Sequence, residues 1–410
     1  MTATDPRVVP AEAAARVPSL VGVVWALLVV NVLGIAGFET IVAIPGSVLQ
    51  LVTMGSVVVA FALALLLNPR VQCRPSLYLV ILSLVLVVGI ASSLRLESGY
   101  GSLVRCFRFA VFVATLWLLS RWWRGDLTFV RHHLRVVSVV LLSVLAGLVV
   151  APGTARAEIY DGRLAGVVWP ITPTQVGQYG AVAAGLAILL WLTRELDRRT
   201  TLIIVPAAVV ILLMTHTRTA TIGFLVGIAG AGLTLVSTSS RARRGAVGAV
   251  IGAVVAVVGF LPALQEWYAR DQDPELIGNL TGRQKVWDGL LAEERTRYQE
   301  LLGIGLTDKS YDGLPIDSAW LAVYWEQGLV GVVLVAIALV GLLTAAALQP
   351  PSPARACAVF LILYCAVAAY TEVGLGDASQ YLLHLAVAAS LLVPGTGRDA
   401  HVGTSQRAAP

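Results

Sequence analysis

The sequence is poor in charge. Asp, Glu, Lys and Arg make up only 13% of its 410 residues, whereas they make up roughly a quarter of a soluble globular chain. Hydrophobic residues account for 57% of the chain, so it lacks the polar side chains needed to cover a surface in water. This composition argues against an ordinary soluble protein and indicates that a lipid bilayer surrounds much of the chain.

Cysteine is also scarce, and the common catalytic motifs are absent. No Walker A loop, HExxH motif or GxSxG motif occurs, and no cysteines have CxxC spacing. We therefore expect no disulfide framework and no metal site, and we interpret the cysteines as small buried hydrophobic residues. The four cysteines are Cys73, Cys106, Cys357 and Cys365.

Long apolar runs dominate what is present. A membrane-spanning helix needs about 20 apolar residues, and the run near 201–216 is short and contains Pro206. Twelve candidates lie near 19–38, 41–67, 76–93, 103–120, 135–151, 174–193, 201–216, 219–237, 245–264, 318–346, 355–371 and 378–394. They predict an all-α integral membrane protein, a bundle of about twelve transmembrane helices with one large extracytoplasmic loop. The first run lacks a cleavage site, so we expect an uncleaved helix.

The distribution of positive charge predicts the orientation. Alternate segments, starting with the N-terminus, carry 17 of the 29 Lys and Arg residues but only 6 of the 24 acids. Basic loops stay on the cytoplasmic side, so both termini should be cytoplasmic. The net charge of +5 then reflects topology, and we expect no nucleic-acid partner. The predicted regions are a cytoplasmic tail (1–18), helices 1–9 (19–264), the outer loop (265–317), helices 10–12 (318–394) and a disordered tail (395–410).

The outer loop should contain an amphipathic helix. Thr281 and Gln284 form a capping-box pattern, so this helix should start at about Gly282, and Gly303 and Gly305 should end it. Its apolar stripe consists of Val286, Trp287, Leu290, Leu291, Tyr298, Leu301 and Leu302.

Two arginines are unusual for their positions. Arg283 lies in the first turn of this helix, where the dipole disfavours a cation by some 0.3–1 kcal/mol. A cation beside free backbone N–H groups makes an anion site, although a solvated surface arginine also fits. Arg218 lies between two apolar segments, and arginine at membrane depth is usually paired or functional. Its alternative role is pairing with Glu326.

Other polar residues near the predicted outer face are weaker candidates. Arg105 and Arg108 share one helix face and can reach the interface by snorkelling. Asp317 can act as a helix N-cap or as a general base. Glu326 lies nine residues further on, roughly 13 Å deeper and on the opposite face, which favours a structural ion pair. His216 and His384 are possible bases, although a lone histidine in a bundle is more often a packed polar residue.

Three further patterns concern packing or are set aside. Gly223 with Gly227, and Gly248 with Gly252, form GxxxG motifs that permit close helix contact. Asp271 and Asp273 form a DxD motif, but it falls on the predicted outer face, where nucleotide sugars are not expected. The segment 279–281 is a formal glycosylation sequon.

The chain resembles the superfamily of O-antigen ligases and O-antigen polymerases, which are bacterial membrane glycosyltransferases. Three local patterns carry the resemblance: TRTA with Arg218, TGRQKVW with Arg283, and DSAWLAVYWEQGLVG with Ser318 and Gly328. The last departs from the family pattern, because Asp317 stands where ligases typically have histidine.

The resemblance implies transfer of a glycan from undecaprenyl diphosphate to an acceptor hydroxyl, at the outer face of a bacterial inner membrane. Arg218 and Arg283 would neutralise the departing diphosphate and Asp317 would be the base, with no metal or other cofactor required. The further candidates for contact with diphosphate or glycan are Arg105, Arg108, Trp287, Glu326 and His384. The acceptor would be a glycan or a lipid. The alternatives are a transporter or flippase of an anionic lipid, and a noncatalytic scaffold.

Overall fold

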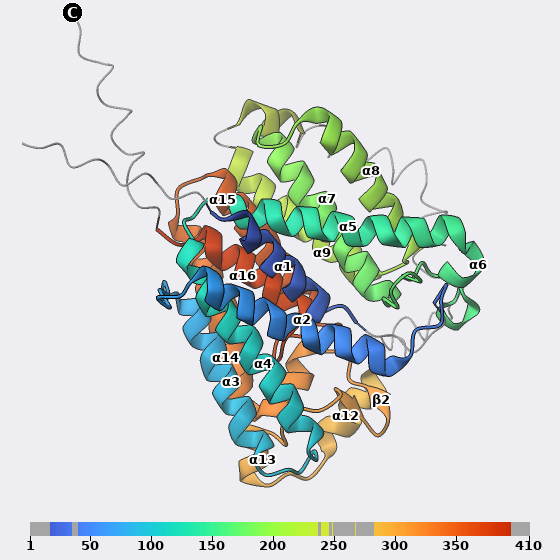
Figure 1. The fold of residues 1–410 in the computed structure, drawn as a ribbon, viewed down its shortest axis with the longest axis vertical. Coiled ribbons are helices and arrows are strands. Elements are labelled where there is room, and N and C mark those ends of the chain that lie inside the picture. Colours follow the sequence, from blue (N-terminus) through green and yellow to red (C-terminus); the bar gives the residue numbers. More distant parts are fainter. Residues whose placement is uncertain are drawn as a thin grey trace, which may run out of the picture.

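The computed structural model describes residues 17–34, 40–236, 239–245 and 283–394, with the single residues 248 and 267. This part of the chain is almost entirely helical (Figure 1). Its longer helices are α1 (Ser19–Asn31), α2 (Gly46–Leu67), α3 (Leu77–Ser93), α4 (Gly101–Leu119), α5 (Thr128–Val150), α7 (Pro173–Leu192), α8 (Arg198–Met214), α9 (Arg218–Val236), α14 (Ala319–Leu348), α15 (Pro353–Ala368) and α16 (Gln380–Leu391). The shorter elements are η1 (Ser120–Trp122), α6 (Pro152–Ala155), η2 (Glu158–Tyr160), α12 (Arg283–Ala292), α13 (Arg297–Leu302), and a two-stranded antiparallel sheet of β1 (Ser310–Tyr311) and β2 (Leu314–Pro315).

The helices follow the apolar runs of the sequence. Every predicted span except the one near 245–264 coincides with a described helix. Within the described residues, six helices are long and apolar enough to cross a membrane: α2, α4 continued through η1, α5, α7, α9 and α14. Helices α1, α3, α15 and α16 are apolar but shorter. The prediction of an all-α chain with membrane-spanning helices agrees with this architecture, whereas the count of twelve spans stays a prediction.

Several predictions fall on residues outside the described ranges. These are the tails 1–16 and 395–410, most of the run 245–264 with Gly252 of its GxxxG motif, and the first part of the outer loop, 265–282 apart from Trp267. The DxD motif, the sequon and the capping residue Thr281 lie in that loop. One described boundary differs from its prediction, since α5 begins at Thr128 rather than near 135. The Asp126 carboxylate accepts a hydrogen bond from the Thr128 backbone N–H at 2.9 Å, which favours this earlier start.

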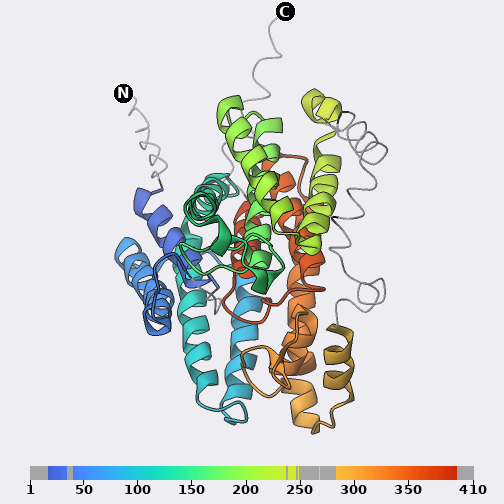
Figure 2. The ribbon, with the colours of Figure 1, turned by 90° about the vertical axis from the view of Figure 1, so that its right-hand side faces the viewer.

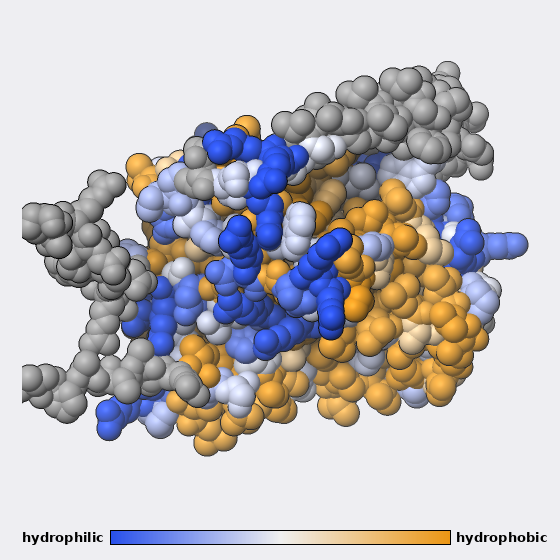
Figure 3. Space-filling model, turned by 90° about the horizontal axis from the view of Figure 1, so that it is seen from above, coloured by the Kyte–Doolittle hydropathy of each residue, from blue (hydrophilic) through white to orange (hydrophobic). Residues whose placement is uncertain are grey.

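The loops predicted to be cytoplasmic meet at one end of the bundle. Arg74 donates to the Trp123 carbonyl at 2.8 Å, and the Gly125 N–H donates to the Ser390 carbonyl at 3.1 Å. Arg131 and Glu195 join two further loops of this group in an ion pair of 2.5 Å. The face seen from above in Figure 3 carries one patch of hydrophilic side chains bordered by hydrophobic ones. This division suits a bundle whose sides contact lipid and whose ends contact water.

The loops predicted to be external meet at the other end. Ser98 donates to the Ile304 carbonyl at 2.8 Å, which joins the α3–α4 loop to the segment after α13. Arg163 donates to the Thr215 carbonyl at 2.8 Å, which joins the loop before α7 to the turn between α8 and α9. Figure 2 shows the segment of α12 and α13, in gold and orange, at the lower end of the molecule beside the loop between α3 and α4. The described part of the predicted outer loop therefore covers one end of the bundle.

Small residues allow α9, α7 and α15 to pack closely. A Cβ added at Gly227 would lie 2.8 Å from the Phe360 ring, and one at Gly185 would lie 2.0 Å from it. At Gly223 the added atom would lie 3.0 Å from the Tyr364 ring. The GxxxG motif of α9 thus works as predicted, as a packing motif that lets aromatic side chains of α15 approach the backbone.

A chain of buried polar side chains crosses the middle of the bundle. The Trp25 indole donates to His133 Nδ1 at 3.1 Å, and His133 Nε2 lies 2.9 Å from His384 Nδ1. Because Nδ1 of His133 accepts, its Nε2 carries the proton and donates to His384. His384 Nε2 in turn lies 2.9 Å from Nε2 of the Gln178 side-chain amide. His384 has no exposed surface and packs in the core, and its predicted contact with substrate stays a prediction.

Helix α14 is broken at Gly328, which the apolar run did not predict. Gly328 has φ +63° and ψ −165°, a conformation that is essentially restricted to glycine. The turn after α13 enters the break: the N–H groups of Ile304 and Gly305 donate to the carbonyls of Trp325 and Glu326 at 3.1 and 3.0 Å. The carbonyls released by the break are thereby satisfied. A Cβ at Gly328 would lie 2.3 Å from the Leu301 backbone, so glycine is required there.

The single amphipathic helix expected after residue 282 is two helices. Residues 293–296 interrupt it, and Thr296 starts α13 with a complete capping box in which Thr296 and Gln299 satisfy each other's backbone N–H groups. The apolar stripe is correspondingly incomplete, because Leu291 and Leu301 are more than half exposed. Gly303, with φ +76°, ends α13 as predicted.

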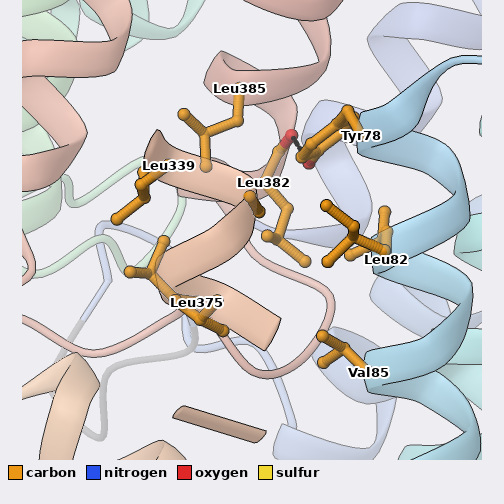
Figure 4. A pocket seen from close by; sticks show the side chains of 10 residues that line it. Tyr78, Leu82, Val85, Leu339, Leu375, Leu382 and Leu385 are labelled. Carbon is orange, nitrogen blue, oxygen red and sulfur yellow. Dashed lines mark hydrogen bonds between the residues drawn. The ribbon is translucent and has the colours of Figure 1, made fainter. Parts of the chain in front are cut away.

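The packing of α3 against α14 and α16 leaves a small apolar cavity (Figure 4). Leu82, Leu339 and Leu385 point into it, and the Tyr78 hydroxyl beside it donates to the Leu382 carbonyl at 2.7 Å. Its volume of about 10 Å³ is close to one water-sized sphere. This cavity is a packing gap and does not hold a substrate.

Candidate functional site

Arg283 and Asp317 form an ion pair at the end of the bundle where the external loops meet. Arg283 Nε donates to Asp317 Oδ2 at 3.1 Å, and the two side chains are 25% and 34% exposed. Asp317 was predicted as a possible N-cap, but Ser318 occupies the N-cap position of α14 and Asp317 has a positive φ of 45°. The Asp317 side chain is therefore directed by its ion pair with Arg283 rather than by the helix start.

A third arginine, which the sequence reasoning missed, lies beside this pair. Arg163 donates through Nε to the Thr215 carbonyl at 2.8 Å and through Nη2 to the Thr217 hydroxyl at 3.3 Å. Burial lowers the pKa of Arg163. The negative charges of Glu372 and Asp161 raise this pKa, and the positive charges of Arg283 and Arg218 lower it. Arg163 is thus within electrostatic reach of both predicted diphosphate ligands.

The turn before α9 places Arg218. Thr217 precedes the helix and Arg218 is its first residue, so Arg218 belongs to the turn whose backbone N–H groups have no partner within the helix. His216 in the same turn has φ +48° and stacks on Trp267 with ring centroids 5.7 Å apart. A helix start with an arginine favours an anion at this position.

Glu372 is the second residue that the sequence reasoning missed. It follows α15 in a half-buried position, and the hydroxyl of the preceding Thr371 lies 2.5 Å from that of Thr219 in α9. Burial and the negative charge of Asp317 raise the pKa of Glu372 to about 7, while Arg283 and Arg163 act in the opposite direction. Glu372 therefore belongs to the same group of charges.

We call Arg163, Arg218, Arg283, Asp317 and Glu372 the arginine cluster. Its members come from four separate parts of the chain, and no short motif joins Arg163 or Glu372 to the others. One signal was nevertheless present in the sequence. Glu372 stands just beyond the C-terminal end of an apolar helix, where the helix dipole disfavours a negative charge. This position indicates either a neighbouring cation or a functional role.

Trp287 supports this cluster from α12. Its indole N–H donates to the Ile316 carbonyl at 2.7 Å, and its ring meets Tyr370 edge-on at 5.6 Å. Ile316 immediately precedes Asp317, and Tyr370 lies two residues before Glu372. The described contacts of Trp287 join the two backbone segments that carry the carboxylates, and its predicted contact with substrate stays a prediction.

A second group of charges lies further along the same loops, and we call it the lysine cluster. Lys309 Nζ forms an ion pair of 2.6 Å with Asp377 Oδ1, with side chains 15% and 9% exposed. Burial alone would raise the pKa of Asp377, but Lys309, followed by Arg108 and Arg105, lowers it. Arg108 Nη2 also donates to the Asn31 and Ala378 carbonyls at 3.0 and 3.2 Å. Arg108 therefore joins loops together and does not merely extend to the interface.

Glu326 completes the lysine cluster. Its Oε1 accepts hydrogen bonds from the Thr307 backbone N–H at 2.7 Å and the Thr307 hydroxyl at 3.1 Å, and only 1% of the residue is exposed. The predicted ion pair of Glu326 is not found among the described residues, because Lys309 pairs with Asp377. The alternative pairing of Glu326 with Arg218 also fails, since Arg218 lies in the arginine cluster. Glu326 therefore holds the loop at Thr307, and its predicted contact with substrate stays a prediction.

The four cysteines carry no cross-link. Cys106, Cys357 and Cys365 are buried, as predicted, whereas Cys73 is exposed, and all four are free thiols. Among the described residues, no group of three His, Cys, Asp or Glu side chains is arranged to hold a metal ion.

The arginine cluster is chemically suited to a di-anion. Three guanidinium groups can donate paired hydrogen bonds to phosphate oxygens, and a carboxyl group with a pKa near 7 can accept a proton in neutral solution. Comparison of the chain with models of known protein families found no match, and comparison with curated proteins found no related sequence.

Proposed function

We propose that this chain is a membrane glycosyltransferase that moves a glycan from a polyprenyl diphosphate to an acceptor hydroxyl. The observation that carries the proposal is the convergence of Arg163, Arg218 and Arg283 at one end of an apolar helical bundle. A diphosphate whose lipid chain lies in the bilayer would present its charge at such a position. The resemblance to O-antigen ligases and polymerases, carried by the residues around Arg218, Arg283 and Gly328, supports the same reaction.

The reaction requires no nucleotide. The acceptor oxygen attacks the anomeric carbon, the bond from that carbon to the phosphate oxygen breaks, and its electron pair leaves with the lipid diphosphate. The proton of the acceptor hydroxyl passes to a base. The three arginines would stabilise the negative charge that develops on the leaving diphosphate by charge-assisted hydrogen bonds.

We assign the base to Glu372 rather than to Asp317. Asp317 Oδ2 accepts a hydrogen bond from Arg283, so this carboxylate serves to orient an arginine. Glu372 has its pKa raised to about 7, chiefly by burial. A base is most effective when its pKa lies near the working pH. Asp317 is then a positioning residue, although it stands where ligases of the superfamily typically have histidine.

The cellular setting follows from charge distribution. The loops near the arginine cluster belong to the segments that carry the smaller share of the Lys and Arg residues, so the positive-inside rule favours a position outside the cytoplasmic membrane for them. Polyprenyl-linked glycans presented at the outer leaflet would reach the cluster there. The partners are the bilayer, the lipid-linked donor and a glycan or lipid acceptor, in the synthesis of cell-surface polysaccharide.

A transporter or flippase is the second candidate, and the broken helix α14 is the feature that would favour it. In transporters such a break lines a binding cavity. Here the backbone of Ile304 and Gly305 fills the break at Gly328, so the released carbonyls are already occupied. The group of arginines also lies at one end of the bundle, which suits a surface reaction better than passage through the bilayer.

Turnover by the purified full-length protein in lipid tests the proposal. The donor is an undecaprenyl-diphosphate-linked glycan, the acceptors are a panel of glycans and lipids, and the released diphosphate lipid is measured. We expect release that depends on acceptor, and its loss in Arg283→Ala and Arg218→Ala with protein amount unchanged. Full activity in both variants would contradict the assigned roles, and product length would separate ligation from chain extension.

A further inference from the structure

An open pocket of about 420 Å³ lies beside the lysine cluster, between the start of α4 and the segment 304–310. Its volume falls within the range of about 300–1,000 Å³ typical of small-molecule sites. Ile304, Leu306 and Trp325 provide apolar walls, and the remaining lining is polar. This pocket contains none of the residues of the arginine cluster.

The hydroxyl groups of the pocket have already used their hydrogens. Ser98 donates to the Ile304 carbonyl, Ser102 donates to the Gly99 carbonyl at 2.7 Å, and Ser310 donates to Asp308 at 2.6 Å. Each hydroxyl oxygen therefore offers a ligand its acceptor lone pairs. The lining is rich in acceptors, and a matching ligand must bring several hydrogen-bond donors.

Two carboxylates strengthen this preference. Glu97 and Asp308 both line the pocket, and hydrogen bonds from the Ser310 hydroxyl, followed by the Ser310 N–H and Arg105, lower the pKa of Asp308 despite its partial burial. Arg105 is the cation of this lining, and it has no hydrogen bond to any described residue. Glu97 also forms an exposed ion pair with Arg95, which is 3.7 Å away and outside the lining. The lining itself therefore carries two carboxylates against one guanidinium group, which disfavours an anionic ligand.

We propose that this pocket binds one sugar unit that is neutral or carries an amino group. A pyranose offers several hydroxyl donors to Glu97, Asp308 and the serine oxygens, its own oxygens can accept from Arg105, and its C–H face suits the apolar wall. The further step, that this sugar belongs to the acceptor glycan, rests on the proposed function. Ser310 and Asp317 are seven residues apart, so their backbones are at most roughly 25 Å apart, a span that a short glycan can bridge.

Equilibrium binding to the full-length protein in lipid nanodiscs tests the pocket. The probes are methyl α-glucopyranoside, N-acetylglucosamine, glucosamine and glucuronate. We expect saturable binding of at least one of the first three, and binding at least about tenfold weaker for glucuronate because of the two carboxylates. Equal binding of glucuronate and the uncharged sugars would overturn the proposed charge preference.

Two variants and one control locate the binding. Asp308→Asn removes one charged acceptor, and Gly101→Leu extends a side chain from the pocket wall, where an added Cβ meets no atom within 4 Å. Leucine also favours the helix over glycine, so this variant should fold. Each should weaken binding about tenfold or more, whereas Glu294→Gln, the same kind of change at an exposed residue outside the pocket, should not. Unchanged affinity in both pocket variants would refute the site.

A parallel measurement of transfer separates this proposal from the proposed function. Glu372→Gln should abolish transfer and leave sugar binding intact. Sugar binding that is sensitive to Gly101→Leu, in a protein that transfers no glycan, would uphold the pocket and refute the enzyme. If the protein transfers glycan but the pocket variants bind sugar as tightly as the wild type, the pocket is refuted and the proposed function stands.

Discussion

The arginine cluster and the lysine cluster lie at the same end of the molecule and share one loop, yet they differ in how their charges are satisfied. The loop between α15 and α16 carries Glu372 into the first cluster and Asp377 into the second. In the lysine cluster, Lys309 and Asp377 pair at 2.6 Å with side chains 15% and 9% exposed. In the arginine cluster, the Arg283–Asp317 pair is longer, at 3.1 Å, and more exposed, at 25% and 34%.

The two clusters therefore differ in their exposure, and they differ also in the balance of their charges. In the lysine cluster, Lys309, Arg108 and Glu326 are each bound to a carboxylate, a carbonyl or a threonine. In the arginine cluster, three guanidinium groups accompany two carboxylates, and an added anion would improve the balance. The predictions below are changes that should affect one cluster and spare the other.

The largest effect should follow from loss of an arginine. Arg163→Ala should reduce glycan transfer about 10²–10³-fold, the loss typical for removing one group that stabilises charge in a transition state. Arg297→Ala removes an exposed arginine of α13 and should leave the rate unchanged. Rates are compared at equal amounts of folded protein in lipid, and wild-type transfer by Arg163→Ala would remove this residue from the site.

Loss of one partner in the lysine cluster should act on stability. Asp377→Asn leaves the Lys309 ammonium group buried without its counter-ion, and breaking such a pair costs about 3–5 kcal/mol. Thermal unfolding in detergent should show a clear fall in midpoint, and Asp288→Asn, at an exposed aspartate of α12, should show none. An Asp377→Asn protein as stable as the wild type would mean that the pair does not hold the loop.

The sequence predicted the helices well because their cause is local. An apolar run of sufficient length forms a helix in lipid whatever its neighbours, and most boundaries fell within a few residues. The break at Gly328 was not predicted, because it depends on the turn at Ile304 and Gly305 filling the gap. The division into α12 and α13 was not predicted either, because the apolar periodicity continues across it while the capping box at Thr296 starts a new helix.

The site was predicted only in part, for the same reason. Arg218 and Arg283 stood out because arginine is costly where they lie, and the structure brings both near Arg163. Arg163 and Glu372 lie in loops without a motif, and their place depends on how α7, α9 and α15 pack. For Glu326 and His384 the sequence could not name the partners, because Thr307 and His133 are distant in the chain.

A smaller effect concerns pH. Glu372 accepts a proton only when ionised, so transfer should fall about tenfold per pH unit below about 7 and level off above it. Glu372→Gln should be slow at every pH and lose this dependence. Steady-state rates between pH 5 and 9 provide the measurement, and an unchanged profile in the variant would assign the base elsewhere.

The same group affects stability with the opposite sign. A carboxyl group whose pKa is raised on folding favours the fold in its protonated form, so its contribution is fully present below the unfolded pKa and is lost as pH rises through about 7. The wild-type protein should therefore lose some stability across this range relative to Glu372→Gln. Thermal unfolding at pH 5 and pH 8 measures the difference between the two proteins.

The smallest effect should come from α13, whose C-terminal end packs at the break in α14. Thr296→Ala removes the capping box of α13 and should cost about 1 kcal/mol. Hydrogen exchange of the α13 amides should become faster, while exchange in α14 beyond Gly328 stays the same. Unchanged exchange in α13 would show that its contacts with the break in α14 are sufficient without the cap.

The most direct test of the account is the affinity of the full-length protein for a polyprenyl diphosphate, compared with the matching monophosphate, in lipid nanodiscs. If the arginine cluster binds a diphosphate, the wild type should prefer it by about tenfold or more. The variants Arg163→Ala, Arg218→Ala and Arg283→Ala should lose that preference, and Arg297→Ala should keep it. Equal affinity for the two lipids in the wild type, or a preference that survives all three substitutions, would contradict the central claim.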